Sequence, residues 1–195
     1  MKVIGLTGGI ASGKSTASAY LRELGAAIVD ADAISRASTR RGGAAFEAVC
    51  AAFGNILGAD GEIDRRKLGG IVFADEDARR KLNSIVHPAV MAESRAQIEN
   101  ARASGVKMCI LDVPLLFETG MEKLCDETWL IYVPREEQIR RMAERDGLDA
   151  AAAAARIDSQ MPLEEKLKRA DVAIDSSGTI EQTREKLRRL WEERT

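Results

Sequence analysis

The stretch that decides the fold is IGLTGGIASGKST, residues 4–16, in which an apolar run gives way to glycines and then to a lysine. Gly8, Gly13, Lys14 and Ser15 have the spacing of a phosphate-binding loop, which lies between a strand and the first turn of a helix. In such a loop the glycines let backbone N–H groups turn toward phosphate oxygens. The alternative is a glycine-rich turn that merely joins a strand to a helix.

The loop predicts a site for a nucleoside triphosphate. Lys14 can reach the β- and γ-phosphates, and the Ser15 hydroxyl can bind Mg²⁺. The residues expected to hold the nucleotide are Gly8, Gly9, Ala11, Ser12, Gly13, Lys14, Ser15 and Thr16. The Asn-Lys-x-Asp pattern with which GTPases read guanine is absent, and the chain is short for an ATP-driven motor. A kinase fits better, and a nucleotide-sensing regulator without phosphoryl transfer is the main alternative of another class.

The bulk composition is that of an ordinary globular chain. Of its 195 residues 45% are hydrophobic, and the net charge of −2 argues against a nucleic-acid-binding protein. Three cysteines without a Cys-x-x-Cys pair fit a reducing compartment. The first residues break into glycines too early for a signal peptide, and no apolar stretch is long enough to span a membrane. We therefore expect a cytoplasmic protein that binds neither nucleic acid nor membrane, and favour a monomer.

Five short apolar runs predict strands, and helical patterns separate them. The runs are continuous rather than alternating, as in strands covered on both faces, and they occupy residues 3–6, 27–29, 108–111, 129–133 and 172–174. A helix is expected over residues 14–24, ending before a left-handed Gly25, and Thr179 with Gln182 forms a capping box for the last helix. The predicted fold class is therefore α/β, with a five-stranded parallel sheet flanked by helices.

Two long excursions interrupt the sheet. We expect one domain, with a core of residues 1–35, 105–134 and 170–195, a helical acceptor-binding insert over about 36–104 and a helical lid over about 135–169. Within the insert, helices are predicted over 44–53, 75–86 and 88–103, because Pro88 disfavours a helical residue before it. Six alanines at 150–155 favour helix but offer little to bury, which suits an arm that moves.

Acidic residues follow two of the predicted strands, at the edge where ligands bind in parallel sheets. Asp30 and Asp32 end the second strand, and Asp32 can accept a proton from an attacking hydroxyl or simply cap a helix from Ala33. Asp112 ends the third strand, where an acid can help hold the water shell of Mg²⁺ or be an ordinary strand end.

Four further residues are weaker candidates. Arg141 and Arg145 are four residues apart, on one helical face, and can stabilise charge on a transferring phosphoryl group. The alternative is a solvated helix with pairs such as Glu137 and Arg141. His87, the single histidine, fits a structural hydrogen bond better than catalysis, and Leu115 can line a pocket for the acceptor.

In combination, the motifs resemble the dephospho-CoA kinase family. The resemblance runs from residues 4–16 through LGAAIVDADAI (24–34), VHP (86–88), VPLLFE (113–118) and QIRRMAERD (138–146) to ADVAIDSSG (170–178). It implies transfer of the ATP γ-phosphoryl to the ribose 3′-hydroxyl of dephospho-CoA with Mg²⁺. It further implies that Asp32 is the base and that Arg141 and Arg145 are the lid arginines. For the acceptor, we expect contacts from Asp32, His87 and Leu115. One departure is Ser176, where the family usually has Asn, so adenine contacts there can differ.

Overall fold

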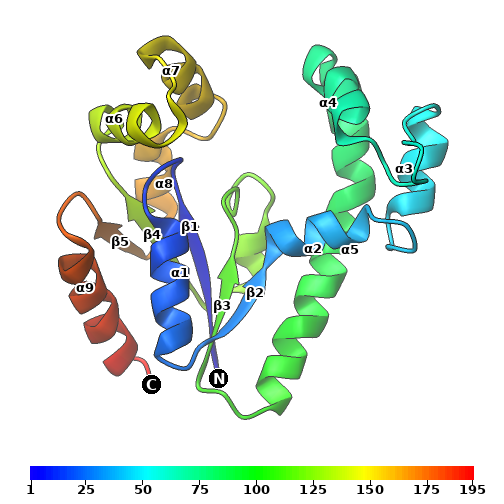
Figure 1. Ribbon diagram of the computed structural model, residues 1–195. Coiled ribbons are helices and arrows are strands. Elements are labelled where there is room, and N and C mark those ends of the chain that lie inside the picture. Colours follow the sequence, from blue (N-terminus) through cyan, green and yellow to red (C-terminus); the bar gives the residue numbers. More distant parts are fainter. The chain divides into compact units, whose positions relative to one another are not determined.

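The computed structural model describes residues 1–195, and its centre is a five-stranded parallel sheet in the order β2-β3-β1-β4-β5 (Figure 1). The central strand β1 pairs with β3, with Ile4 opposite Ile110, and with β4, with Leu6 opposite Trp129. The strands are β1 (Lys2–Gly8), β2 (Ala27–Asp30), β3 (Met108–Asp112), β4 (Glu127–Tyr132) and β5 (Val172–Asp175). All five predicted strands are confirmed, each with ends shifted by at most a few residues.

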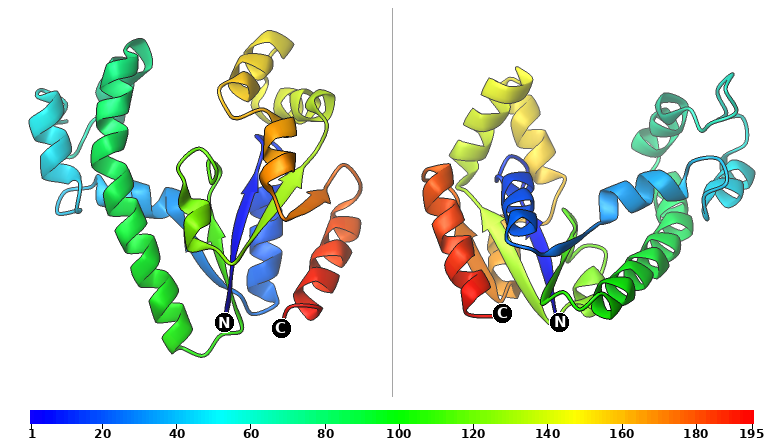
Figure 2. Two further views of the ribbon diagram at one scale, coloured as in Figure 1. Left: turned by 180° about the vertical axis from the view of Figure 1, so that it is seen from behind. Right: turned by 60° about the horizontal axis from the view of Figure 1, so that its bottom comes forward.

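Helices follow the strands in the α/β pattern. They are α1 (Lys14–Glu23), α2 (Ala31–Ser38), α3 (Phe46–Phe53), α4 (Arg65–Ala74), α5 (Glu76–Ala103), α6 (Arg135–Asp146), α7 (Ala150–Asp158), α8 (Leu163–Arg169) and α9 (Ile180–Glu192), with a short 3-10 helix at Met121–Leu124. The run of α6, α7 and α8 between β4 and β5 can be followed in Figure 2. None of these helices is long and apolar enough to cross a membrane.

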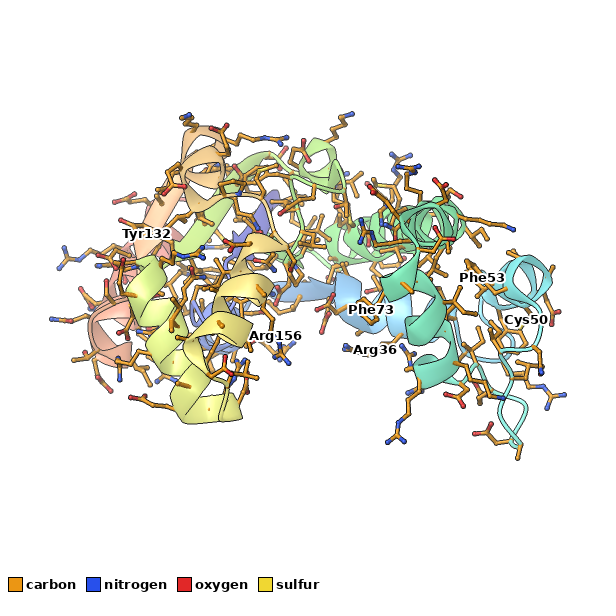
Figure 3. All side chains as sticks on the ribbon, turned by 90° about the horizontal axis from the view of Figure 1, so that it is seen from above. Arg36, Cys50, Phe53, Phe73, Tyr132 and Arg156 are labelled. Carbon is orange, nitrogen blue, oxygen red and sulfur yellow. The ribbon has the colours of Figure 1, made fainter.

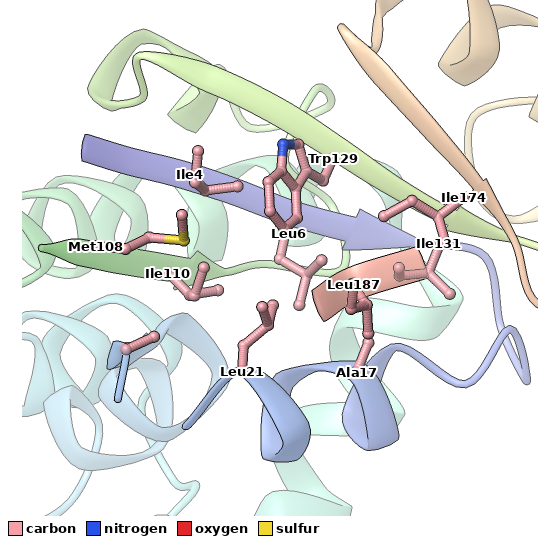
Figure 4. Close-up of a cluster of buried hydrophobic side chains, with 11 residues drawn as sticks. Ile4, Leu6, Ala17, Leu21, Met108, Ile110, Trp129, Ile131, Ile174 and Leu187 are labelled. Atoms are coloured by element: carbon pink, nitrogen blue, oxygen red, sulfur yellow. The ribbon is translucent and has the colours of Figure 1, made fainter. Parts of the chain in front are cut away.

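One face of the sheet is buried against α1 and α9 (Figure 4). Ile4 and Leu6 of β1 point to this face because strand residues alternate, and both are fully buried. Leu21 of α1 and Leu187 of α9 complete the layer. Each such side chain stabilises the fold by about 1.5–3 kcal/mol relative to exposure.

The opposite face is equally well covered. At Gly5 of β1, a Cβ atom would lie 2.7 Å from Cys125 Sγ and 2.9 Å from a methyl carbon of Leu116, so this position has no room for a side chain. Burial raises the pKa of the Cys125 thiol to about 12, with help from nearby acidic groups. The strands therefore run between two apolar layers, which explains their continuous hydrophobic sequence.

The predicted ends of α1 and α9 are confirmed. Gly25 has φ of +104°, and the N–H of Ala26 donates to the carbonyl of Leu21, the pattern of a left-handed helix cap. At α9, the Thr179 side chain accepts from the Gln182 N–H and the Gln182 side chain accepts from the Thr179 N–H. Local sequence signals thus predicted both of these boundaries.

The chain divides into two compact units. One comprises residues 1–29 and 98–195 and contains the sheet, and the other comprises residues 30–97. The second unit is built from α2, α3, α4 and most of α5, and its apolar side chains Phe46, Val49, Ile56 and Leu68 are buried. Its limits differ from the predicted insert of 36–104: residues 30–35 belong to it, and residues 98–104 do not.

The predicted helix break at Pro88 is wrong, because α5 is one continuous helix with Pro88 inside it. A proline in a helix interior removes one hydrogen bond and costs about 3 kcal/mol. On this helix, however, Val86, Val90 and Ser94 are spaced by four residues and all are buried. A buried stripe that continues on both sides of the proline offsets the local cost, so His87 lies in a helix rather than at a corner.

Candidate active site

The phosphate-binding loop has the backbone that its sequence predicts. Gly13 has φ of +85° and Ala11 has φ of +59°, the one non-glycine residue with positive φ in the chain. The N–H groups of Gly13, Lys14, Ser15 and Thr16 make no backbone hydrogen bond. Because they stand at the positive end of α1, they form a ready anion site.

Side chains from distant parts of the sequence support this loop. Gln138 of α6 is buried and donates from Nε2 to the carbonyl of Ile10 at 2.7 Å. Ser176, after β5, is also buried, and its hydroxyl lies 2.6 Å from the carbonyl of Ser12 and 3.0 Å from that of Tyr132. Sequence reasoning did not identify Gln138, since nothing local marks a contact with a residue 128 positions away.

Lys14 and Asp112 form an ion pair at the loop. Their side chains are 16% and 11% exposed, so the pair is largely shielded from water. Asp112 thus lies beside the phosphate loop, as its position at the end of β3 predicts. Asp112 provides a counter-charge to Lys14 at the loop.

The oxygen ligands near the loop fit an Mg²⁺ ion that is bound mainly by the phosphates of a nucleotide. The chain has no group of three or more His, Cys, Asp or Glu residues that could hold a metal by itself. Mg²⁺ in phosphoryl-transfer sites does not need such a cage, because phosphates and water supply most of its ligands. Ser15 offers an exposed hydroxyl and Asp112 a carboxylate, both next to Lys14.

The two candidate arginines of α6 lie in different surroundings. Arg141 donates from Nη1 to the carbonyl of Ala11 at 3.3 Å and from Nη2 to that of Ser176 at 2.8 Å, so its guanidinium contacts the phosphate loop. It also pairs with Glu137 at 2.7 Å, and hydrogen bonds from Arg140 and Arg141 lower the pKa of Glu137 to about 2. Arg145 is mostly exposed and pairs with Asp146.

A pocket of about 500 Å³ lies next to the loop, lined mainly by the end of β4 and the segment between β4 and β5, and its lining includes Gly9, Tyr132, Gln138 and Lys166. Tyr132, at the end of β4, is labelled in Figure 3. Arg135, at the start of α6, makes two hydrogen bonds to Asp158, at the end of α7, of 2.6 and 3.0 Å.

The wall of this cavity formed by α8 is anchored by a buried lysine. Lys166 is 1% exposed, and its ammonium lies 3.0 Å from Glu118 Oε1 and 3.3 Å from the carbonyl of Pro114. Leu115 does not line the cavity and is 39% exposed. The alanine run buries more than predicted, because Ala153 of α7 is completely buried where α7 packs against α6.

In the second unit, the structure separates the roles of two neighbouring acids. The alternative in which Asp32 caps a helix from Ala33 is excluded: Asp30 is the N-cap of α2, and its carboxylate accepts the N–H of Ala33 at 2.9 Å. The helix starts at Ala31, two residues earlier than expected, since it begins directly after β2, and so Asp32 is an exposed residue of its first turn. His87 lies in the same unit, exposed on α5.

Comparison with known proteins gives a consistent result. Residues 2–182 match the family model described as dephospho-CoA kinase. The chain is 54% identical to the dephospho-CoA kinase of Carboxydothermus hydrogenoformans over 188 residues, which cover 96% of this chain and 91% of that protein. It is 52% identical to the enzyme of the same name from Geobacillus kaustophilus, with 94% and 92% covered.

Solved structures resemble the chain over its whole length. A protein of Thermus thermophilus has a TM-score of 0.84 and 35% identity, with 100% of this chain and 98% of that chain covered. The dephospho-CoA kinase of Campylobacter jejuni has a TM-score of 0.68 and 30% identity, with 100% and 97% covered. The shikimate kinase of Acinetobacter baumannii, 16% identical with a TM-score of 0.55, covers 98% of this chain and 92% of its own and shares the fold.

Proposed function

The chain belongs to the dephospho-CoA kinase family, and we propose that it transfers the γ-phosphoryl group of ATP to the ribose 3′-hydroxyl of dephospho-CoA, the last step of coenzyme A biosynthesis. The observation that carries the proposal is the combination of identity above 50% over nearly the whole chain with a complete phosphate loop. Within this reaction, each candidate residue receives a definite task.

The phosphate loop binds ATP. The N–H groups from Gly13 to Thr16 hold phosphate oxygens, and Lys14 turns from Asp112 toward the β- and γ-phosphates. Ser15 and Asp112 are the residues that would hold Mg²⁺, directly and through water respectively. When bound, Mg²⁺ neutralises charge on the phosphates and so favours departure of ADP.

Asp32 serves the acceptor. Asp30 already supplies the cap of α2, so the Asp32 carboxylate is not needed for that purpose. We assign it the proton of the attacking 3′-hydroxyl, which it orients and accepts as the bond to phosphorus forms. His87 and Leu115 are proposed as further acceptor contacts, and the exposure of both side chains is compatible with that task.

Arg141 is the stronger of the two arginine assignments. Its guanidinium already lies against the loop, where it can stabilise negative charge that develops during transfer. Arg145 would first have to leave Asp146 to take part. We further propose that the protein acts in the cytoplasm as a monomer and binds neither nucleic acid nor membrane, in keeping with its net charge of −2.

The test is a mass measurement on purified protein with ATP, Mg²⁺ and dephospho-CoA. The account predicts that dephospho-CoA gains one phosphate as ADP forms in equal amount. Shikimate serves as a control acceptor, because shikimate kinase shares the fold. ATP binding without turnover of either acceptor would instead support a nucleotide-sensing regulator.

A further inference from the structure

A second pocket lies wholly within residues 30–97, and its lining is strongly basic. It has a volume of about 420 Å³ and is lined by Arg36, Thr39, Arg40, Glu62, Ile63 and Arg65. Arg36 extends from α2 (Figure 3), Arg40 follows that helix, and Arg65 is the first residue of α4. Three guanidinium groups thus face one carboxylate.

The three arginines of this pocket face a single carboxylate, so the lining keeps an excess of positive charge. Arg36, Arg40 and Arg65 make no ion pair and no side-chain hydrogen bond, whereas most other arginines of the chain pair with Asp or Glu. The single acid, Glu62, is already engaged by the backbone N–H of Arg41 at 3.1 Å. Like charges held around one space repel each other, and an anion bound there would relieve that repulsion.

The chemistry of guanidinium groups selects the kind of anion. Their planar array of N–H donors matches pairs of phosphate oxygens, and several such groups around one pocket suit a ligand with more than one phosphate. The ATP phosphates are already served by the phosphate loop of the other unit. The acceptor of the proposed reaction carries its own diphosphate, on the 5′ carbon of the same ribose that bears the 3′-hydroxyl.

Helix α2 connects this pocket to the acceptor base. Asp32 and Arg36 are four residues apart on α2, so they project from the same face, about 6 Å apart along the helix axis. This separation is compatible with a ribose whose 3′-hydroxyl lies at Asp32 and whose 5′ substituent extends along the helix toward Arg36. We propose that Arg36, Arg40 and Arg65 bind the diphosphate of dephospho-CoA, an inference that rests on the function proposed above.

The sequence offers a matched control beside two of these arginines. Arg66 follows Arg65 on α4, and Arg41 follows Arg40; both are exposed, and neither lines the pocket. We would compare R65Q with R66Q and R40Q with R41Q, measuring KM for dephospho-CoA, KM for ATP and thermal unfolding. Adenosine, which has the 3′-hydroxyl but no diphosphate, is the second acceptor.

The expected result is that R65Q and R40Q each raise KM for dephospho-CoA about tenfold, as loss of a charged hydrogen bond predicts. The ratio of kcat/KM for dephospho-CoA to that for adenosine falls by the same factor, whereas R66Q and R41Q change KM by less than about twofold. Equal effects of the pocket and control variants, or equal loss with both acceptors, would overturn the inference. A wild-type protein inactive on dephospho-CoA would instead reject the proposed function, and the inference with it.

Discussion

Replacement of Asp112 by asparagine tests how the phosphate loop is held ready for nucleotide. The side chains of Asp112 and Lys14 are 11% and 16% exposed, so the burial of this ion pair is intermediate. Fully exposed ion pairs contribute at most about 1 kcal/mol to stability, and disruption of a buried ion pair costs about 3–5 kcal/mol. We therefore expect D112N to lower the free energy of unfolding by about 2 kcal/mol without nucleotide. D77N is the control, because Asp77 is 81% exposed and pairs with Arg80 on one helix.

The same variant separates the two tasks of Asp112. ATP phosphates replace the lost counter-charge of Lys14, so ATP without Mg²⁺ should restore stability to D112N. If Asp112 also orders water around Mg²⁺, the gain in ATP affinity on adding Mg²⁺ should be about tenfold smaller in D112N than in wild type. Calorimetric titration with ATP at fixed Mg²⁺ measures this gain. Unfolding of D112N at the wild-type free energy, together with an unchanged Mg²⁺ effect, would refute the reasoning.

Three further outcomes are expected. D30A should lower the free energy of unfolding by about 1 kcal/mol through loss of the α2 cap, while kcat is retained. D32N should lower kcat by at least about a hundredfold with little change in the free energy of unfolding. The reverse pattern would mean that Asp30 acts on the acceptor and that Asp32 stabilises the helix. G8A should weaken ATP binding in titration calorimetry, since its Cβ would lie 2.5 Å from Ser12 Oγ and 2.7 Å from the carbonyl oxygen of Ile131. G70A, in open space on α4, should instead raise the free energy of unfolding in urea by about 1 kcal/mol. Burial opposes the charge of Glu127, but hydrogen bonds from Arg194 and other donors outweigh burial and lower the pKa of Glu127 from 4.5 to about 2. The ionised carboxylate therefore contributes about 3 kcal/mol to the free energy of unfolding, which is present above pH 4.5 and is lost as the pH falls through about 2. In urea unfolding across this range, E127Q should show a smaller pH dependence than the wild type.

The parts of the structure that follow local rules were predictable from sequence. The phosphate loop, the left-handed Gly25 and the capping box at Thr179 each depend on residues within a few positions of each other, and all are found. The order of apolar runs likewise predicted the five strands. Such features need no knowledge of which distant segments meet.

Where several local rules compete, the sequence is less informative. Pro88 satisfies the rule for a helix start, yet the buried stripe through Val86 and Val90 keeps α5 continuous. The helix α4, with Gly69 and Gly70 in its interior, was not predicted, because two glycines weaken the helical signal. There, burial of Leu68 and Val72 outweighs propensity.

The supporting contacts of the site could not be predicted from one sequence. Gln138 bonds to Ile10, and Lys166 pairs with Glu118, across many intervening residues. Neither residue belongs to a motif with a mechanism of its own, and their positions follow only from how the sheet brings β1, β3 and β4 together. Arg141 was identified by its spacing, but its contact with the loop at Ala11 came from the structure.

The most direct test of the central claim is to determine where the phosphate is added. Phosphorus NMR of the products from ATP, Mg²⁺ and dephospho-CoA should show one new phosphomonoester on the 3′-oxygen of the ribose, with the diphosphate signals retained. The new signal should be absent when D32N replaces the wild-type protein for the same time. A phosphate on any other atom, or no new phosphomonoester while ATP is bound, would contradict the account.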